Sequence, residues 1–118
     1  MLRFAILIHD HPSIHWDFLL EHGDHCRSWR MPTDPTSIKT CEITAEGLPD
    51  HRTLYLDYEG PVSGGRGSVI RQDSGTFEWR INQPDLCEVE LTGTKWRGVI
   101  RLERINDREW KATCEANI

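Results

Sequence analysis

The sequence predicts an all-β protein, a compact antiparallel β barrel of about eight strands with at most a short helical turn. Three observations lead to this prediction. Apolar and polar residues alternate with a period of two, as in residues 87–91 and 100–103, turn-forming residues recur at short intervals, and no helical stripe a dozen residues long is present. Closing such strands on themselves removes the exposed sheet edges and leaves a mouth or groove for a ligand.

Strand and turn signals follow one another along the whole chain. Residues 2–8 are apolar apart from Arg3 and predict a buried strand, and the alternation over 15–20 predicts the next one. Residues 32–37 contain two prolines and predict a loop, whereas 44–50 are expected to hold a single helical turn. Tight reversals between further strands are predicted at 22–24, 63–65, 73–75, 82–85, 92–94 and 106–107.

The length and the charge limit the possible functions. The 118 residues suit one domain, which we expect to span residues 1–118. A net charge of -5 excludes a protein that binds nucleic acid through a broadly basic surface, so such contacts have to be local. Eleven of the fourteen basic residues are arginine, whose planar guanidinium suits phosphate. The apolar start lacks the length of a membrane span and the flanks of a signal peptide, so we expect a cytoplasmic protein without membrane contact.

The four cysteines Cys26, Cys41, Cys87 and Cys114 stand singly in the sequence. The absence of a Cys-x-x-Cys pair argues against a thiolate zinc site and against a disulfide framework. We therefore expect reduced, partly buried thiols.

Two histidines and an aspartate near the start of the chain predict a metal site. His15 and Asp17 are two residues apart, so in an extended strand both project from one face. His9 ends the preceding strand, and the short link through Pro12 brings that strand back beside the next one. Such a set leaves coordination positions open for water and substrate, and it suits Mn²⁺, Zn²⁺ or Fe²⁺. Two alternatives stay open: His11 competes with His9, and all of these can be ordinary polar residues of a half-buried strand.

Two further segments carry groups that suit phosphate. In residues 50–60, taken as an extended segment, His51 and Tyr55 share one face and can donate hydrogen bonds to a phosphate oxygen. An ordinary strand with an amphipathic tyrosine is the alternative. The glycine-rich residues 61–68 offer Arg66 as a phosphate clamp, with a flexible hairpin as the alternative. This loop lacks the Lys-Ser/Thr ending of a P-loop, which excludes nucleotide binding of that type.

These residues belong to a longer collinear pattern: His9-Asp10, His15-Trp16-Asp17-Phe18, Leu20-Glu21, Ser28-Trp29, Pro32, Asp50-His51, Tyr55, Glu59-Gly60, Gly67-Ser68-Val69 and Gly75-Thr76. The pattern resembles the 3′-phosphoesterase domain of bacterial DNA ligase D. The resemblance implies a compact β barrel in which His9, His15 and Asp17 bind Mn²⁺, or Zn²⁺ or another divalent transition metal in its place. It also implies that His51 and Tyr55 contact the scissile phosphate as catalytic residues.

The resemblance further implies end healing in nonhomologous end joining. A 3′-terminal ribonucleotide is removed to leave a 3′-phosphate, and that phosphate is then removed to leave a 3′-hydroxyl. The implied substrates are DNA or RNA-tipped DNA 3′ ends, with a separate ligase or end-joining factor as a further partner.

The chain departs from the family pattern near the metal site. The family has an arginine two residues after the motif aspartate, where this chain has Leu19, and the glycine-rich loop is shorter and lacks the family's Glu-Tyr pair. Two other functions therefore compete with the phosphoesterase. One is a non-catalytic module that binds DNA ends or phosphate and retains the barrel and the metal site. The other is a metal-dependent hydrolase of a small phosphate ester, which suits the acidic net charge.

Overall fold

The computed structural model describes residues 1–37 and 40–117, except for the side chain of Cys41. Within these residues the chain is all-β, and no helix is long and apolar enough to cross a membrane. The elements are β1 (Leu2–His9), β2 (His15–His22), β3 (His25–Met31), β4 (Thr40–Arg52), the 3₁₀ turn η1 (Thr53–Leu56), β5 (Gly60–Pro61), β6 (Ser68–Asn82), β7 (Leu86–Gly93), β8 (Arg97–Arg104) and β9 (Glu109–Ala116).

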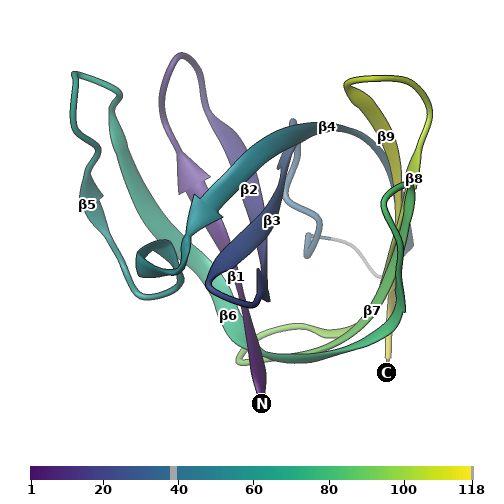
Figure 1. The fold of residues 1–118 in the computed structure, drawn as a ribbon. Coiled ribbons are helices and arrows are strands. Elements are labelled where there is room, and N and C mark those ends of the chain that lie inside the picture. The colour runs from purple at the N-terminus through teal and green to yellow at the C-terminus, as the bar shows by residue number, and fades with distance from the viewer. Residues whose placement is uncertain (38–39, 118) are drawn as a thin grey trace.

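Eight of the strands close into an antiparallel barrel (Figure 1). The hydrogen-bonded order is β1-β2-β3-β4-β9-β8-β7-β6, and β6 pairs back onto β1, with Phe77 opposite Leu2 and Val69 opposite His9. The short strand β5 pairs with the start of β6. The predicted fold class is confirmed, and closure leaves the barrel without a long free edge.

Apolar side chains pack on both sides of the barrel wall. On β2, Phe18 and Leu20 point into the interior, where they pack with residues from every barrel strand. Leu19, between them, points outward into a smaller cluster with Leu7 and Leu56. This outer cluster lies under η1, so the 3₁₀ turn covers one patch of the outer surface of the barrel.

The helical turn lies downstream of its predicted position. Residues 44–50 belong to β4 instead. Gly47 is needed there for packing and not for a turn, because a Cβ would lie 2.6 Å from the indole nitrogen of Trp110. The prediction that residues 50–60 form one extended segment is also wrong, since β4 ends at Arg52 and η1 follows directly.

The predicted reversal at residues 73–75 is wrong as well. These residues lie inside β6, a strand of 15 residues. Gly75 allows β6 and β7 to approach closely, since a Cβ there would overlap the carbonyl group of Thr92. The carboxylate of Asp73 accepts hydrogen bonds from backbone N–H groups of the β7–β8 loop. Aspartate and glycine are common in turns, but here they serve tertiary contacts.

The cysteine side chains that the structure describes are buried, in agreement with the sequence prediction. Cys26 and Cys87 are free thiols, and burial raises the pKa of the Cys26 thiol to about 11. The side chain of Cys41 lies outside the described residues. A thiol with a raised pKa is a poor nucleophile at neutral pH, so Cys26 serves packing.

Candidate metal centre

His9, His15 and Asp17 meet on the outer face of the barrel, at the end of the β1–β2 hairpin. Strand pairing places His9 directly opposite His15, and Asp17 lies two residues further along β2 on the same face. One potential ligand atom from each residue lies within 4.8 Å of the other two. The three side chains converge as the sequence predicts, and the first histidine of the cluster is His9 and not the exposed His11. Metal ligation itself stays a prediction.

In both histidines, a backbone carbonyl binds the ring nitrogen that faces away from the aspartate. His9 Nε2 lies 2.7 Å from the carbonyl oxygen of Arg66, and His15 Nδ1 lies 2.9 Å from the carbonyl oxygen of Ser13. A carbonyl oxygen only accepts hydrogen bonds, so each ring donates its N–H there. In the neutral imidazoles this leaves lone pairs on His9 Nδ1 and His15 Nε2, the two atoms that face Asp17.

In the neutral tautomers, the lone pairs of both histidines face carboxylate oxygens. His9 Nδ1 is 3.3 Å from Asp17 Oδ2, and His15 Nε2 is 3.1 Å from Asp17 Oδ1. His15 and Asp17 are only 4% and 3% exposed. Among the described residues, His15 Nε2 and Asp17 Oδ1 have no hydrogen-bond partner. Converging acceptors repel one another, and each unsatisfied buried polar atom costs on the order of 1–3 kcal/mol. A cation between the three side chains would remove both penalties.

The donor set fits a divalent transition-metal ion. Two imidazole nitrogens and one carboxylate oxygen suit Mn²⁺, Fe²⁺ or Zn²⁺, and three protein ligands leave positions for water and substrate. Metal-bound histidines usually donate their second N–H to a carbonyl or carboxylate, which fixes the ring orientation. Both histidines of the cluster make such a bond. The residues present therefore fit a metal ion of this class.

A pocket of about 580 Å³ opens beside the cluster and contains the other predicted site residues. His51 lies at the end of β4, Tyr55 lies in η1 and Arg66 lies in the glycine-rich loop; all three line this pocket. The rings of His51 and Tyr55 have their centroids 5.9 Å apart. The two residues do not share an extended strand; η1 follows β4 directly and holds Tyr55 against His51.

The glycine-rich loop contacts the cluster through its backbone. The Arg66 carbonyl accepts the His9 N–H, while its exposed guanidinium donates to Ser63, with Nε 2.7 Å from the Ser63 carbonyl oxygen. Asp10 fastens the loop to the end of β1, because its carboxylate accepts the backbone N–H of Ser68 at 2.7 Å. This hydrogen bond lowers the pKa of the Asp10 carboxyl. Phosphate binding by Arg66 stays a prediction.

Arg30 is a pocket residue that the sequence analysis missed. It lies on β3 directly opposite Asp17, so the two side chains share one face of the sheet. Its Nε atom is buried and has no hydrogen-bond partner within residues 1–37 and 40–117. A sequence signal was present, since Arg30 alternates with the buried Trp29 and Met31. Only the β2–β3 register, however, reveals that it faces the cluster.

Comparison with known proteins connects the chain to one family. The family model described as the DNA ligase D 3′-phosphoesterase domain matches residues 8–104. The multifunctional non-homologous end joining protein LigD of Pseudomonas aeruginosa is 32% identical over 80 residues, which cover 65% of this chain and 10% of that protein. The multifunctional non-homologous end joining DNA repair protein LigD of Mycobacterium tuberculosis is 34% identical over 119 residues, which cover 92% of this chain and 15% of that protein.

These matches extend over most of the chain but over a small part of each relative. The chain spans only 10% to 15% of the length of these curated relatives. The family match includes the cluster, the end of β4, η1 and the glycine-rich loop. The chain belongs to the DNA ligase D 3′-phosphoesterase domain family.

Proposed function

We propose that this protein is a metal-dependent 3′-phosphoesterase that heals DNA or RNA-tipped DNA 3′ ends by removing a 3′-terminal ribonucleotide and a 3′-phosphate. The observation that carries the proposal is the cluster of the half-buried His9 with the buried His15 and Asp17, whose acceptor atoms converge beside a pocket lined by His51 and Tyr55. Membership of the 3′-phosphoesterase family supports the reaction class. The names of the relatives support a place in end joining, with a separate ligase or end-joining factor as partner.

Both proposed reactions hydrolyse a phosphate ester. Water attacks phosphorus; the P–O bond to the terminal ribonucleoside breaks in the first reaction, and the P–O bond to the 3′ oxygen breaks in the second. A divalent ion in the cluster would supply positive charge for the phosphoryl oxygens and orient the nucleophile. His51 Nδ1 donates to the Pro49 carbonyl at 3.2 Å, which leaves Nε2 to hold or move a proton at the phosphate. The Tyr55 hydroxyl would donate a hydrogen bond to a phosphate oxygen.

Local positive charge in this pocket suits an anionic substrate. Arg30, Arg52 and Arg66 all line it, in a chain whose net charge is -5. Because the overall charge repels nucleic acid at long range, binding has to depend on these few short-range contacts. We therefore expect the protein to contact only the few nucleotides at the 3′ end of the strand, and not a long stretch of nucleic acid along a basic surface.

Two primers test the proposal, one ending in a single ribonucleotide and one ending in a 3′-phosphate. We expect no product after metal is removed with a chelator, and both products after Mn²⁺ is added back; Zn²⁺ and other divalent ions are compared in parallel. Asp17→Asn should lower the rate by about 100-fold or more, because it weakens a ligand of the ion. His22→Ala is the matched control, since His22 lies at the other end of β2 and belongs neither to the cluster nor to the lining of the pocket. Product formation in chelator, or full activity of Asp17→Asn, would contradict the proposal.

A non-catalytic module that binds DNA ends or phosphate is the second candidate. Leu19 favours it, because this position is fully buried in the outer apolar cluster where the resemblance leads us to expect an arginine. Binding of the 3′-phosphate primer without product under every metal tested would support this candidate over the enzyme.

A further inference from the structure

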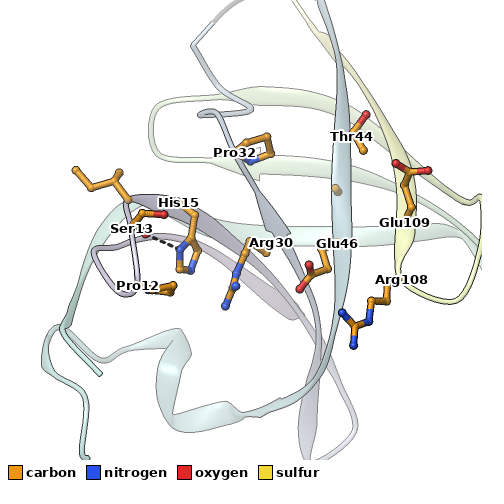
Figure 2. A pocket seen from close by; sticks show the side chains of 11 residues that line it. Pro12, Ser13, His15, Arg30, Pro32, Thr44, Glu46, Arg108 and Glu109 are labelled. Carbon is orange, nitrogen blue, oxygen red and sulfur yellow. Dashed lines mark hydrogen bonds between the residues drawn. The ribbon is translucent and has the colours of Figure 1, made fainter. Parts of the chain in front are cut away.

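A second pocket lies against the metal centre on the outer face of the barrel. This side pocket, bounded by Ile14, Pro32, Glu46 and Arg108, has a volume of about 410 Å³ (Figure 2). It lies within the size range of pockets that bind small molecules, about 300–1,000 Å³. His15 of the cluster also lines it. A ligand held at the metal centre can therefore extend into the side pocket.

Arg30 lines both pockets. Along the sheet it lies between Asp17 on β2 and Glu46 on β4, and it is directly opposite both. Figure 2 shows its side chain between His15 and Glu46. The residues that the structure describes nevertheless provide no ion pair for Arg30, and its buried Nε has no hydrogen-bond partner. A guanidinium stays charged at every physiological pH, so a half-buried one without a partner favours an anion.

The walls of the side pocket suit the remainder of a nucleotide. Ile14 and Pro32 give it an apolar wall, and Ile14 is 64% exposed although it is a large apolar side chain. The carboxylates of Glu46 and Glu109, which are opposite one another on β4 and β9, line another part of it. The lining holds two guanidinium groups, those of Arg30 and Arg108. Because only Arg30 also lines the pocket beside the cluster, we place the phosphate group there. The apolar wall can then pack against a sugar and a base.

We propose that the side pocket is a subsite for the nucleoside on the 5′ side of the reacting phosphate, and that Arg30 binds that phosphate where the two pockets meet. The inference rests on the proposed function, because it uses a 3′ end as the ligand. The nucleoside on the 5′ side is common to both proposed substrates, whereas the terminal ribonucleotide is present in only one. The side chains of Ile14 and Pro32 present no hydrogen-bond donor or acceptor to a base edge, so the subsite accepts all four bases.

Calorimetric titration of the metal-free protein with three probes tests the subsite without turnover. The probes are inorganic phosphate, thymidine 5′-monophosphate and thymidine 3′-monophosphate. We expect the 3′-monophosphate to bind about 10-fold or more tightly than the other two, because only it places a nucleoside on the 5′ side of a terminal phosphate. The 3′-monophosphates of the other three nucleosides should bind within about 3-fold of thymidine 3′-monophosphate. Equal affinity for the three probes would overturn the proposal.

Two variants separate the phosphate contact from the nucleoside contact. Arg30→Met keeps the length of the side chain and should weaken binding of thymidine 3′-monophosphate by about 10- to 100-fold, the loss of a hydrogen-bonded charge. Arg30→Lys should restore part of the lost affinity, since lysine retains the positive charge but not the planar guanidinium that forms two parallel hydrogen bonds to phosphate. Ile14→Glu should remove the preference for the 3′-monophosphate over inorganic phosphate. Arg97→Ala is the matched control, because Arg97 is exposed on β8 and lines neither pocket.

The outcomes distinguish this inference from the proposed function. Titration of each variant with Mn²⁺ should show unchanged metal affinity, since neither Arg30 nor Ile14 belongs to the cluster. If the protein prefers the 3′-monophosphate through Arg30 but has no phosphoesterase activity, the subsite proposal stands and the proposed enzymatic function is refuted. An active enzyme whose Arg30→Met and Ile14→Glu variants bind all probes as the wild type does would refute the subsite.

Discussion

Two buried aspartates of this barrel are equally shielded from water but have opposite surroundings. Asp17 and Asp73 are each 3% exposed. The carboxylate of Asp73 accepts backbone N–H groups of Ser74, Lys95 and Trp96 at 2.9, 3.1 and 3.0 Å. The carboxylate of Asp17 faces two imidazole nitrogens, and its Oδ1 has no hydrogen-bond partner within the described residues.

The comparison teaches that the partners of a buried carboxylate, and not its burial, indicate its use. Asp73 fastens β6 to the β7–β8 loop, and Gly93 leaves room for it, because a Cβ there would press against its Oδ2 atom. Its charge is satisfied by the fold itself. Asp17 is positioned by strand register, and a cation bound between it and the two histidines would make its environment favourable. We therefore predict that the region of Asp73 is complete without a ligand and that the region of Asp17 is completed by a metal ion.

The largest expected effect on stability comes from Asp73. Asp73→Ala leaves three backbone N–H groups without their acceptor, and we expect it to lower the free energy of unfolding by about 3 kcal/mol. Chemical denaturation followed by tryptophan fluorescence measures this loss. The activity of the molecules that remain folded should be unchanged. A loss of activity larger than the loss of folded protein would contradict a purely structural role for Asp73.

Metal binding to the cluster that contains Asp17 should stabilise the fold by nearly as much as Asp73 does. Mn²⁺ at 100 times its dissociation constant should raise the free energy of unfolding of the wild type by about 2.7 kcal/mol. Asp17→Asn should show no such increase. Without metal, this variant should be at least as stable as the wild type, since it removes the repulsion among the acceptors.

The same denaturation series serves as the control for that prediction. His11→Ala should respond to Mn²⁺ as the wild type does. If metal-free Asp17→Asn proved as unstable as Asp73→Ala, Asp17 would be structural too.

An intermediate effect is expected from the loop that positions His9. Gly67 has a φ of 72°, and a Cβ there would overlap the Asp10 carboxylate. Gly67→Ala should therefore destabilise the fold by about 1–3 kcal/mol. Because the neighbouring Arg66 carbonyl binds His9, the substitution should also weaken Mn²⁺ affinity by about 10-fold. Calorimetric metal titration measures this change. Gly23→Ala, at a similar φ of 68° but with nothing nearby, is the control and should leave metal affinity unchanged.

The smallest effect is a pH dependence carried by Asp10. Its hydrogen bond from Ser68 lowers the pKa of the folded-state carboxyl below the ordinary 3.8. The stabilisation is therefore fully present above that value and is lost as the pH falls through the lowered pKa. Asp10→Asn should flatten this part of the stability profile between about pH 5 and pH 2. Thermal unfolding across that range measures it, and identical acid limbs for variant and wild type would show that the loop is fastened by other contacts.

The sequence could predict the fold because alternation is a local signal. Period-two patterns report directly which residues of a strand face an apolar core, and closure of the barrel follows from the need to pair strand edges. The wrong reversal at residues 73–75 has a physical cause. Aspartate and glycine signal turns locally, but Asp73 and Gly75 are used for contacts with a distant loop and with β7. Such contacts leave no local trace.

The candidate site could likewise be predicted from the sequence only in part. His15 and Asp17 could be paired from their spacing on one strand, and His9 from a short hairpin. Arg30 could not be found by spacing, because the β2–β3 register alone places it opposite Asp17. It supplies a guanidinium next to the cluster in a chain that has Leu19 where the resemblance leads us to expect an arginine.

By itself, the sequence determined the barrel class, the His/His/Asp set and the likeness to a phosphoesterase family, since each depends on residues near one another in the chain or on their order. Only the tertiary structure decided that the histidine N–H groups point at the carbonyls of Ser13 and Arg66, that their lone pairs meet at Asp17, and that Arg30 lies between two pockets. The physical reason is that hydrogen-bond direction and burial belong to three-dimensional neighbours. An unsatisfied acceptor or an unpaired guanidinium exists only once those neighbours are known.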